Sequence, residues 1–147
     1  MIRIIGSFLA AIVCTYVLGA IFVSQGNISA VISLGFEVTT AQRFEAAVHD
    51  VTHMFTIYLP VVAVAFIIAL PVAALIIRYL LPDLRLVGYV LAGITAMIAL
   101  HVIFKMVFGV SGIVPTRTMA GLLAQGFAGG VGGLVFHVLS NKPATPS

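Results

Sequence analysis

Four long apolar runs alternate with short polar segments along the chain. They cover residues 4–23, 54–81, 86–110 and 118–139. Each run reaches the ~20 residues that an α-helix needs to cross the ~30 Å hydrocarbon layer of a bilayer. The pattern therefore predicts an all-α integral membrane protein, in which residues 1–140 form one domain, a four-helix transmembrane bundle. The polar residues 141–147 are predicted to be a disordered tail.

The segment between the first two runs, residues 24–53, is the longest stretch outside the predicted spans, and its pattern is amphipathic. Residues 27–36 carry apolar side chains on one helical face, which predicts a short interfacial helix. Thr39 and Gln42 have the spacing of a capping box, and apolar residues recur at helical spacing after them. We therefore expect a helix that begins near Thr40, on the outer or periplasmic side, and continues without a break into the second span.

The composition indicates that lipid is the main solvent of this chain. Hydrophobic residues make up 62% of the sequence and charged residues only 7%, whereas soluble domains carry about 25% charged residues. The 7 basic and 4 acidic residues leave a net charge of +3, and the basic residues are scattered. Because no basic run could hold a nucleic acid, the expected partner is the lipid bilayer and not DNA or RNA.

The basic residues also predict the orientation, because they are enriched in cytoplasmic loops. With the N-terminus inside, four of them fall on the cytoplasmic side: Arg3, Arg78, Arg85 and Lys142. The other three fall on or near the outer side: Arg43, Lys105 and Arg117. The sequence thus favours a plasma-membrane or inner-membrane protein with both termini in the cytoplasm.

Small residues recur every four positions in the first three runs. Because lipid is as apolar as leucine, membrane helices associate where small residues let their backbones approach closely. The first run carries Ser7, Ala11, Thr15 and Gly19. The second carries Ala65, Ala69 and Ala73, and the third carries Gly88, Ala92 and Ala96.

The fourth run has the densest set of small residues: Gly121, Gly126, Gly129, Gly130, Gly132 and Gly133. Gly126 with Gly130, and Gly129 with Gly133, form two overlapping Gly-x-x-x-Gly pairs on adjacent faces. Two interpretations stay open. The glycines pack against helices of the same chain, or they form an oligomer contact or line a pore.

Histidines are the most plausible metal ligands in the sequence. His49 and His53 lie four residues apart on the helix expected after Thr40, with Glu45 one turn earlier. Two such histidines and a carboxylate can bind Zn²⁺ or Cu²⁺. However, the glutamate that follows the first histidine in zinc proteases is missing. The alternative is a polar helix side that faces water.

His101 and Lys105 form an ionisable pair near the end of the third run. Such residues inside a span indicate a function by default, although Lys105 can extend its ammonium group to the headgroups. His101 needs a neighbour, either for a structural hydrogen bond between helices or for a functional role. The candidates are Ser111, Thr118, Gln125 and the His53 end of the second span.

A haem held by two histidines needs both rings at one depth in the membrane. Counting 1.5 Å per residue from the span ends separates His53 from His101 by ~14 Å in depth. His137 falls at the opposite face. Haem is therefore expected only if a helix is shifted or if two subunits share the ligands, and the sequence identifies no cofactor.

No catalytic motif accompanies the adhesive small-residue faces, and the single cysteine, Cys14, cannot form an intrachain disulfide. The sequence therefore favours a small, non-enzymatic membrane protein that acts as a scaffold, an accessory subunit or a homo-oligomer. Its expected partner is another copy or another membrane subunit. Two alternatives stay open: a metal- or haem-binding redox or transport component, and a small oligomeric channel or permease lined by the fourth helix.

Overall fold

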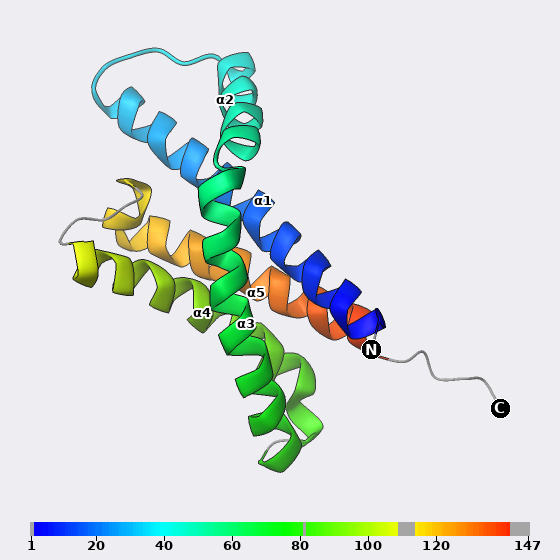
Figure 1. The fold of residues 1–147 in the computed structure, drawn as a ribbon. Helices are drawn as coiled ribbons and strands as arrows, with labels where there is room; N and C mark the ends of the chain where they lie inside the picture. The colour runs from blue at the N-terminus through cyan, green and yellow to red at the C-terminus, as the bar shows by residue number, and fades with distance from the viewer. Residues whose placement is uncertain (1, 81, 109–113, 142–147) are drawn as a thin grey trace.

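The computed structural model describes residues 2–80, 82–108 and 114–141, and every regular element in these ranges is helical (Figure 1). The helices are α1 (Ile2–Ser33), α2 (Thr40–His53), α3 (Phe55–Tyr79), η1 (Pro82–Leu84), α4 (Arg85–Phe108), η2 (Val114–Arg117) and α5 (Met119–Ser140). α1, α3, α5 and the segment of η1 with α4 are long and apolar enough to cross a membrane, with mean hydropathies from 1.6 to 2.8. The prediction of an all-helical chain with four long apolar helices is confirmed. The predicted tail beyond Asn141 and the predicted end of the third run at Val110 lie outside the described residues.

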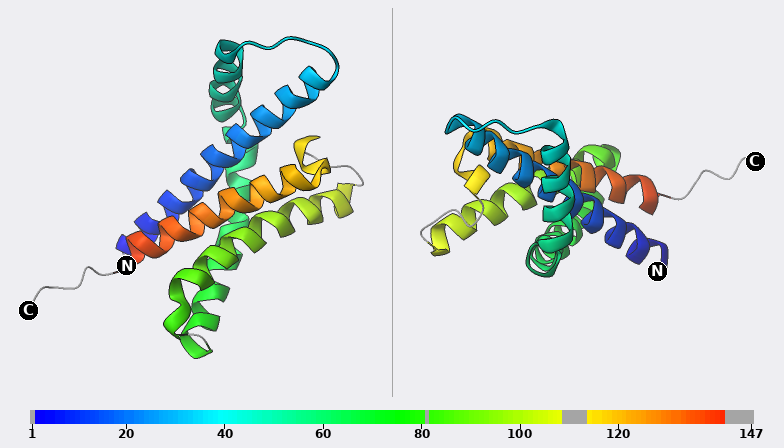
Figure 2. Two further views of the ribbon diagram at one scale, coloured as in Figure 1. Left: turned by 180° about the vertical axis from the view of Figure 1, so that it is seen from behind. Right: turned by 90° about the horizontal axis from the view of Figure 1, so that it is seen from above.

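The long helices meet as crossing layers. α5 lies between α1 and α4 and runs antiparallel to both (Figures 1 and 2). α3 crosses α1 near Tyr16, whose ring centroid lies 6.0 Å from those of Phe55 and Tyr58. The start of α1 and the end of α5 lie together, because Arg3 Nε donates a hydrogen bond of 2.8 Å to the carbonyl oxygen of Leu139. The sequence predicted a four-helix bundle, but it did not predict which helices cross.

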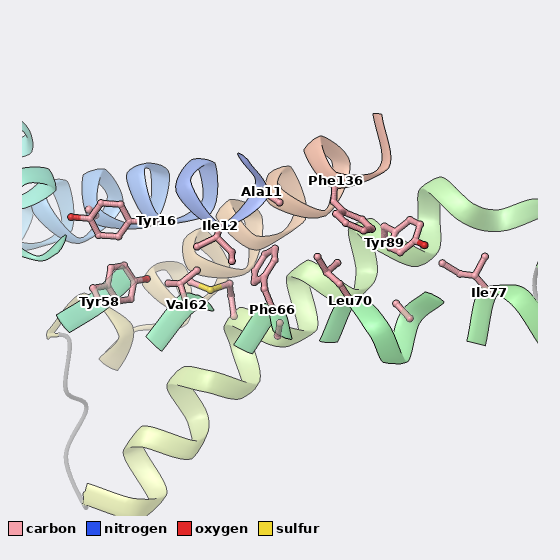
Figure 3. Close-up of a cluster of buried hydrophobic side chains, with 14 residues drawn as sticks. Ala11, Ile12, Tyr16, Tyr58, Val62, Phe66, Leu70, Ile77, Tyr89 and Phe136 are labelled. Carbon is pink, nitrogen blue, oxygen red and sulfur yellow. The ribbon is translucent and has the colours of Figure 1, made fainter. Parts of the chain in front are cut away.

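A hydrophobic core fills the crossing and draws on all four long helices (Figure 3). Val62 and Phe66 of α3 and Met97 of α4 are completely buried, at 0% exposure. Ile12 of α1 and Phe136 of α5 close the cluster from the other side. The side chains of α3 therefore hold it across α1 and α5.

Helix α1 continues well beyond the predicted end of the first span. The prediction of a separate interfacial helix over residues 27–36 is wrong, because α1 is unbroken to Ser33. Gln25 ties this part of α1 to α2: its Nε2 donates to the carbonyl oxygen of Arg43 at 3.2 Å, and its Oε1 accepts from the Arg43 guanidinium at 3.3 Å. The chain turns only after α1 ends, where Gly35 takes a positive φ of 91°.

Helix α2 begins at Thr40, behind the predicted capping box. The Gln42 N–H donates to Thr39 Oγ1 at 3.3 Å, and the Thr39 N–H donates to Gln42 Oε1 at 2.8 Å. The capping box is therefore confirmed, with both of its hydrogen bonds present. This local signal needs only four residues, which is why the sequence located the helix start.

The prediction of one helix from Thr40 into the second span is wrong, because Met54 separates α2 from α3. The Met54 N–H still donates to the carbonyl oxygen of Asp50 at 2.9 Å, so the break is a local one. Val51 provides one of the last carbonyl acceptors of α2, and the Tyr16 hydroxyl of α1 donates to it. The contact with α1 thus reaches the helix backbone at the junction.

Candidate functional site

Helices α4 and α5 touch through their backbones. Gly93 of α4 faces Gly129 of α5, and a Cβ atom added to either would collide with the carbonyl oxygen of the other. Gly133 faces the carbonyl oxygen of Tyr89 in the same way, one turn further along α5. Only glycine permits so close an approach. The face that carries Gly129 and Gly133 is therefore occupied by α4 of the same chain.

The second glycine pair of α5, Gly126 and Gly130, also contacts α4. A Cβ on Gly126 would lie 3.1 Å from Ile98 Cδ1, and a Cβ on Gly130 would lie 2.9 Å from Ile94 Cγ1. Both pairs thus face α4. The exposed side of α5 instead carries large apolar residues: Leu123, Phe127, Leu134 and Val138.

The small-residue row of α1 packs on α5. Its four members are all buried: Ser7, Ala11, Thr15 and Gly19. A Cβ on Gly132 of α5 would collide with Thr15 Oγ1 and would lie 3.0 Å from the carbonyl oxygen of Ala11. Gly121 has a different place at the start of α5, where its N–H donates to the capping hydroxyl of Thr118 at 3.1 Å.

The small residues of α3 and α4 line an open apolar groove of about 650 Å³ between these two helices. Ala73 and Ala96 are its most buried alanines, at 7% and 8% exposure. Ala65, Ala69 and Ala92 are only partly buried. The rim consists of large aliphatic side chains that are about half exposed: Val64, Ile68 and Val72 of α3, and Leu91 and Ile103 of α4. These rows therefore leave part of their surface uncovered by the described chain.

A buried polar cluster lies where α1, α3 and α5 meet. The Tyr58 hydroxyl donates to Gln125 Oε1 at 2.7 Å, and Gln125 Nε2 donates to the carbonyl oxygen of Gly19 at 3.1 Å. Gln125 is 1% exposed and Tyr58 is 4% exposed. One amide side chain thus bridges three helices, and a hydrogen bond shielded from water in this way gives the crossing a defined geometry.

His101 borders this cluster from α4. It is 5% exposed, and its ring packs edge-on against Tyr58 at 6.2 Å between centroids. Its Nδ1 lies 2.7 Å from the carbonyl oxygen of Met97, so Nδ1 carries the proton. Nε2 has no hydrogen-bond partner among the described residues. Of the expected neighbours, Gln125 belongs to the polar cluster that His101 borders, through its hydrogen bond with Tyr58. Ser111 falls outside the described residues. Lys105, the other member of the predicted pair, is exposed.

His49 and His53 lie together on α2. The rings of His49 and His53 stack at 3.9 Å between centroids with an angle of 12° between their planes. His49 Nδ1 is 3.4 Å from Asp50 Oδ1, and His53 Nδ1 is 2.8 Å from the His49 carbonyl oxygen. Within the described ranges, no three or more His, Cys, Asp or Glu side chains gather as metal ligands would. Metal binding by His49, His53 and Glu45 would require these side chains to rearrange, and it stays a prediction.

Tyr58 is the member of the buried cluster that the sequence interpretation missed. The available signal was a hydroxyl group near the start of an otherwise apolar run, since a tyrosine hydroxyl usually finds a hydrogen-bond partner when it is buried. Only the crossing of α3 over α1 and α5 brings Gln125 to it.

Comparisons with protein-family models, with curated protein sequences and with solved structures found no match for this chain. Its function is therefore inferred from its own contacts.

Proposed function

We propose that this chain is an integral protein of the plasma or inner membrane, crossed by α1, α3, α4 and α5, with both termini in the cytoplasm. The outward faces of these helices carry large apolar side chains such as Ile67, at 57% exposure, and Leu91, at 55%. A continuous apolar surface of this kind requires lipid as its solvent. The hydrogen bond from Arg3 to Leu139 supports placing both ends on one side. α2 then lies on the outer side.

In this proposal the protein is a non-enzymatic scaffold that assembles as a homo-oligomer through the α3/α4 groove. The observation that carries it is the alanine-rich lining of the groove. Small-residue rows are what bring membrane helices together. The rows of α1 and α5 are already in contact within the chain, whereas Ala69 and Ala92 remain partly exposed. In this groove, small residues therefore remain exposed for a further helix to contact.

A second copy suits this groove because projections and recesses lie side by side on one surface. Ile68 and Val72 of α3 project next to the alanines, at 62% and 49% exposure. If two copies pair about a two-fold axis, the α3 ridge of each can enter the groove of the other. Such a contact is self-complementary, as two-fold dimers require.

Cysteine crosslinking in isolated native membranes tests the dimer. In a Cys14→Ser background, we expect Ile68→Cys to form a disulfide-linked dimer with an oxidant. Leu123→Cys, on the exposed face of α5, is the matched control and should stay monomeric. Ala69→Leu fills the groove and should reduce crosslinking through Ile68→Cys several-fold, whereas Ala120→Leu on α5 should leave it unchanged.

Two results would contradict the dimer. One is equal crosslinking at Ile68→Cys and Leu123→Cys, which would indicate random collision. The other is a monomer in every variant. A crosslink from Ile68→Cys to a different protein would replace the homo-oligomer with an accessory subunit that uses the same groove.

A further inference from the structure

A second groove lies between α1 and α2, separate from the α3/α4 groove, and has a volume of about 530 Å³. The apolar face of α2 forms one wall, with Phe44, Ala47 and Val48, and Ile21 of α1 contributes to the other. None of the α2 residues is buried, although α2 is amphipathic. This volume is in the range of pockets that hold a small ligand. Phe44 is 72% exposed and Val48 is 47% exposed, so part of the apolar face of α2 is left uncovered by the described protein.

One cation, Arg43, lines this apolar groove. Gln25 of α1 holds it from two sides, since it bonds both the Arg43 carbonyl oxygen and the guanidinium group. Among the described residues, the only close contact between a basic and an acidic side chain joins His49 to Asp50 at 3.4 Å, so no described carboxylate is paired with Arg43. A guanidinium group has five N–H donors, and among the described residues only Gln25 accepts a hydrogen bond from the guanidinium of Arg43. Arg43 therefore retains donors for an anionic group.

We propose that the α1/α2 groove binds one phospholipid of the bilayer, with an acyl chain along the apolar wall and the phosphate on Arg43. Guanidinium groups bind phosphate oxygens in a bidentate way, with charge-assisted hydrogen bonds. An amphipathic helix at the edge of the spans puts such a cation at headgroup level while its apolar face reaches acyl chains. A phospholipid matches this arrangement, because its phosphate lies at headgroup level and its acyl chains extend from there into the apolar layer. The site rests on the membrane placement proposed above, but not on the dimer.

Native mass spectrometry of the full-length protein, released from mild detergent, tests this site. The probe is added dioleoyl phosphatidylglycerol, titrated against the wild-type protein. We expect one tightly bound lipid. Arg43→Gln should weaken that binding about tenfold, the effect of one charge-assisted hydrogen bond. Arg43→Lys should retain part of the affinity, because it keeps the charge but loses the bidentate geometry.

Filling the groove tests its apolar half independently. Ala47→Trp should displace the lipid while Arg43 stays in place. His49→Trp lies on the side of α2 opposite Ala47, where the His49 side chain is 65% exposed and does not line the groove, so it should leave binding unchanged. Arg85→Gln is the matched charge control, since Arg85 is exposed at the start of α4. Circular dichroism of each variant confirms that it is folded before its binding is compared.

Three results would overturn the site. Equal lipid binding by all variants would indicate only the general lipid belt. Loss with Arg43→Gln but not with Ala47→Trp would indicate surface charge without a groove. A photo-crosslinker at Val48 that labels a protein instead of lipid in native membranes would show that a polypeptide covers α2. Absence of the chain from the membrane fraction would instead reject the membrane placement itself.

Discussion

At the scale of single residues, Gln125 is the most consequential polar side chain in the described structure. Its amide group bridges the Tyr58 hydroxyl and the Gly19 carbonyl oxygen in a region from which water is excluded. A hydrogen bond adds only about 0.5–1.5 kcal/mol to stability, but an unsatisfied buried partner costs about 1–3 kcal/mol. Removing one member should therefore be worse than removing the pair.

We expect Gln125→Leu to lower the free energy of unfolding by about 1–3 kcal/mol, because it leaves the Tyr58 hydroxyl unpaired. Tyr58→Phe should cost less, and the double variant should cost less than the sum of the two single variants. Unfolding in detergent by a denaturant series measures the coupling. Tyr79→Phe, at an exposed tyrosine, is the control. Strict additivity would mean that the two side chains do not interact.

At the scale of elements, α5 is the central helix because glycines cover two of its faces. Gly129 and Gly133 admit the backbone of α4, and Gly132 admits Thr15 of α1. The conformational freedom that glycine brings to a helix is unfavourable by about 1 kcal/mol relative to alanine. Close backbone contact offsets this cost only where a neighbouring helix is present.

We expect Gly129→Ala to destabilise the protein by about 1–3 kcal/mol, because the new methyl group must push α4 and α5 apart. Gly6→Ala in α1 is the matched control, since nothing lies within 4 Å of its added Cβ. That variant should be neutral or more stable by up to about 1 kcal/mol, from helix propensity alone. Thermal unfolding in detergent compares the two. Equal midpoints would show that α4 and α5 do not touch at Gly129.

At the scale of the whole molecule, the arrangement joins one end of α1 to one end of α5 and leaves α2 at the other end of α1. The bond from Arg3 to Leu139 and the contact of Gln25 with Arg43 define these two ends. Figure 2 shows the N-terminal end of α1, beside the end of α5, and the opposite end of α1 far apart. In the membrane placement proposed above, these two ends face opposite compartments.

Reporter fusions test this topology. With both termini in the cytoplasm, a green fluorescent protein fused after Ser147 should fluoresce. Alkaline phosphatase inserted after Glu37, which is exposed between α1 and α2, should be active in the outer compartment. The reciprocal fusions are the controls and should be inactive. Active phosphatase at the C-terminus would reverse the proposed orientation.

Several features follow from the sequence alone, because their causes are local. The length of an apolar run decides whether a helix can cross a bilayer, so the four long helices were predicted to within a few residues, except for the end of α1. The capping box at Thr39 and Gln42 needs only its own turn, so the start of α2 was also predicted. The sequence also showed the small-residue rows directly, but it did not predict which helices they contact.

Tertiary structure alone decided which row meets which helix. Several faces of one apolar helix carry small residues, and lipid does not distinguish among them, so only the crossing angles assign Gly129 to α4 and Gly132 to α1. The break at Met54 involves Tyr16, which is distant in sequence. The partner of Tyr58 and the open α3/α4 groove likewise exist only because α3 crosses the other helices, since contacts between remote residues have no periodic signal in the chain.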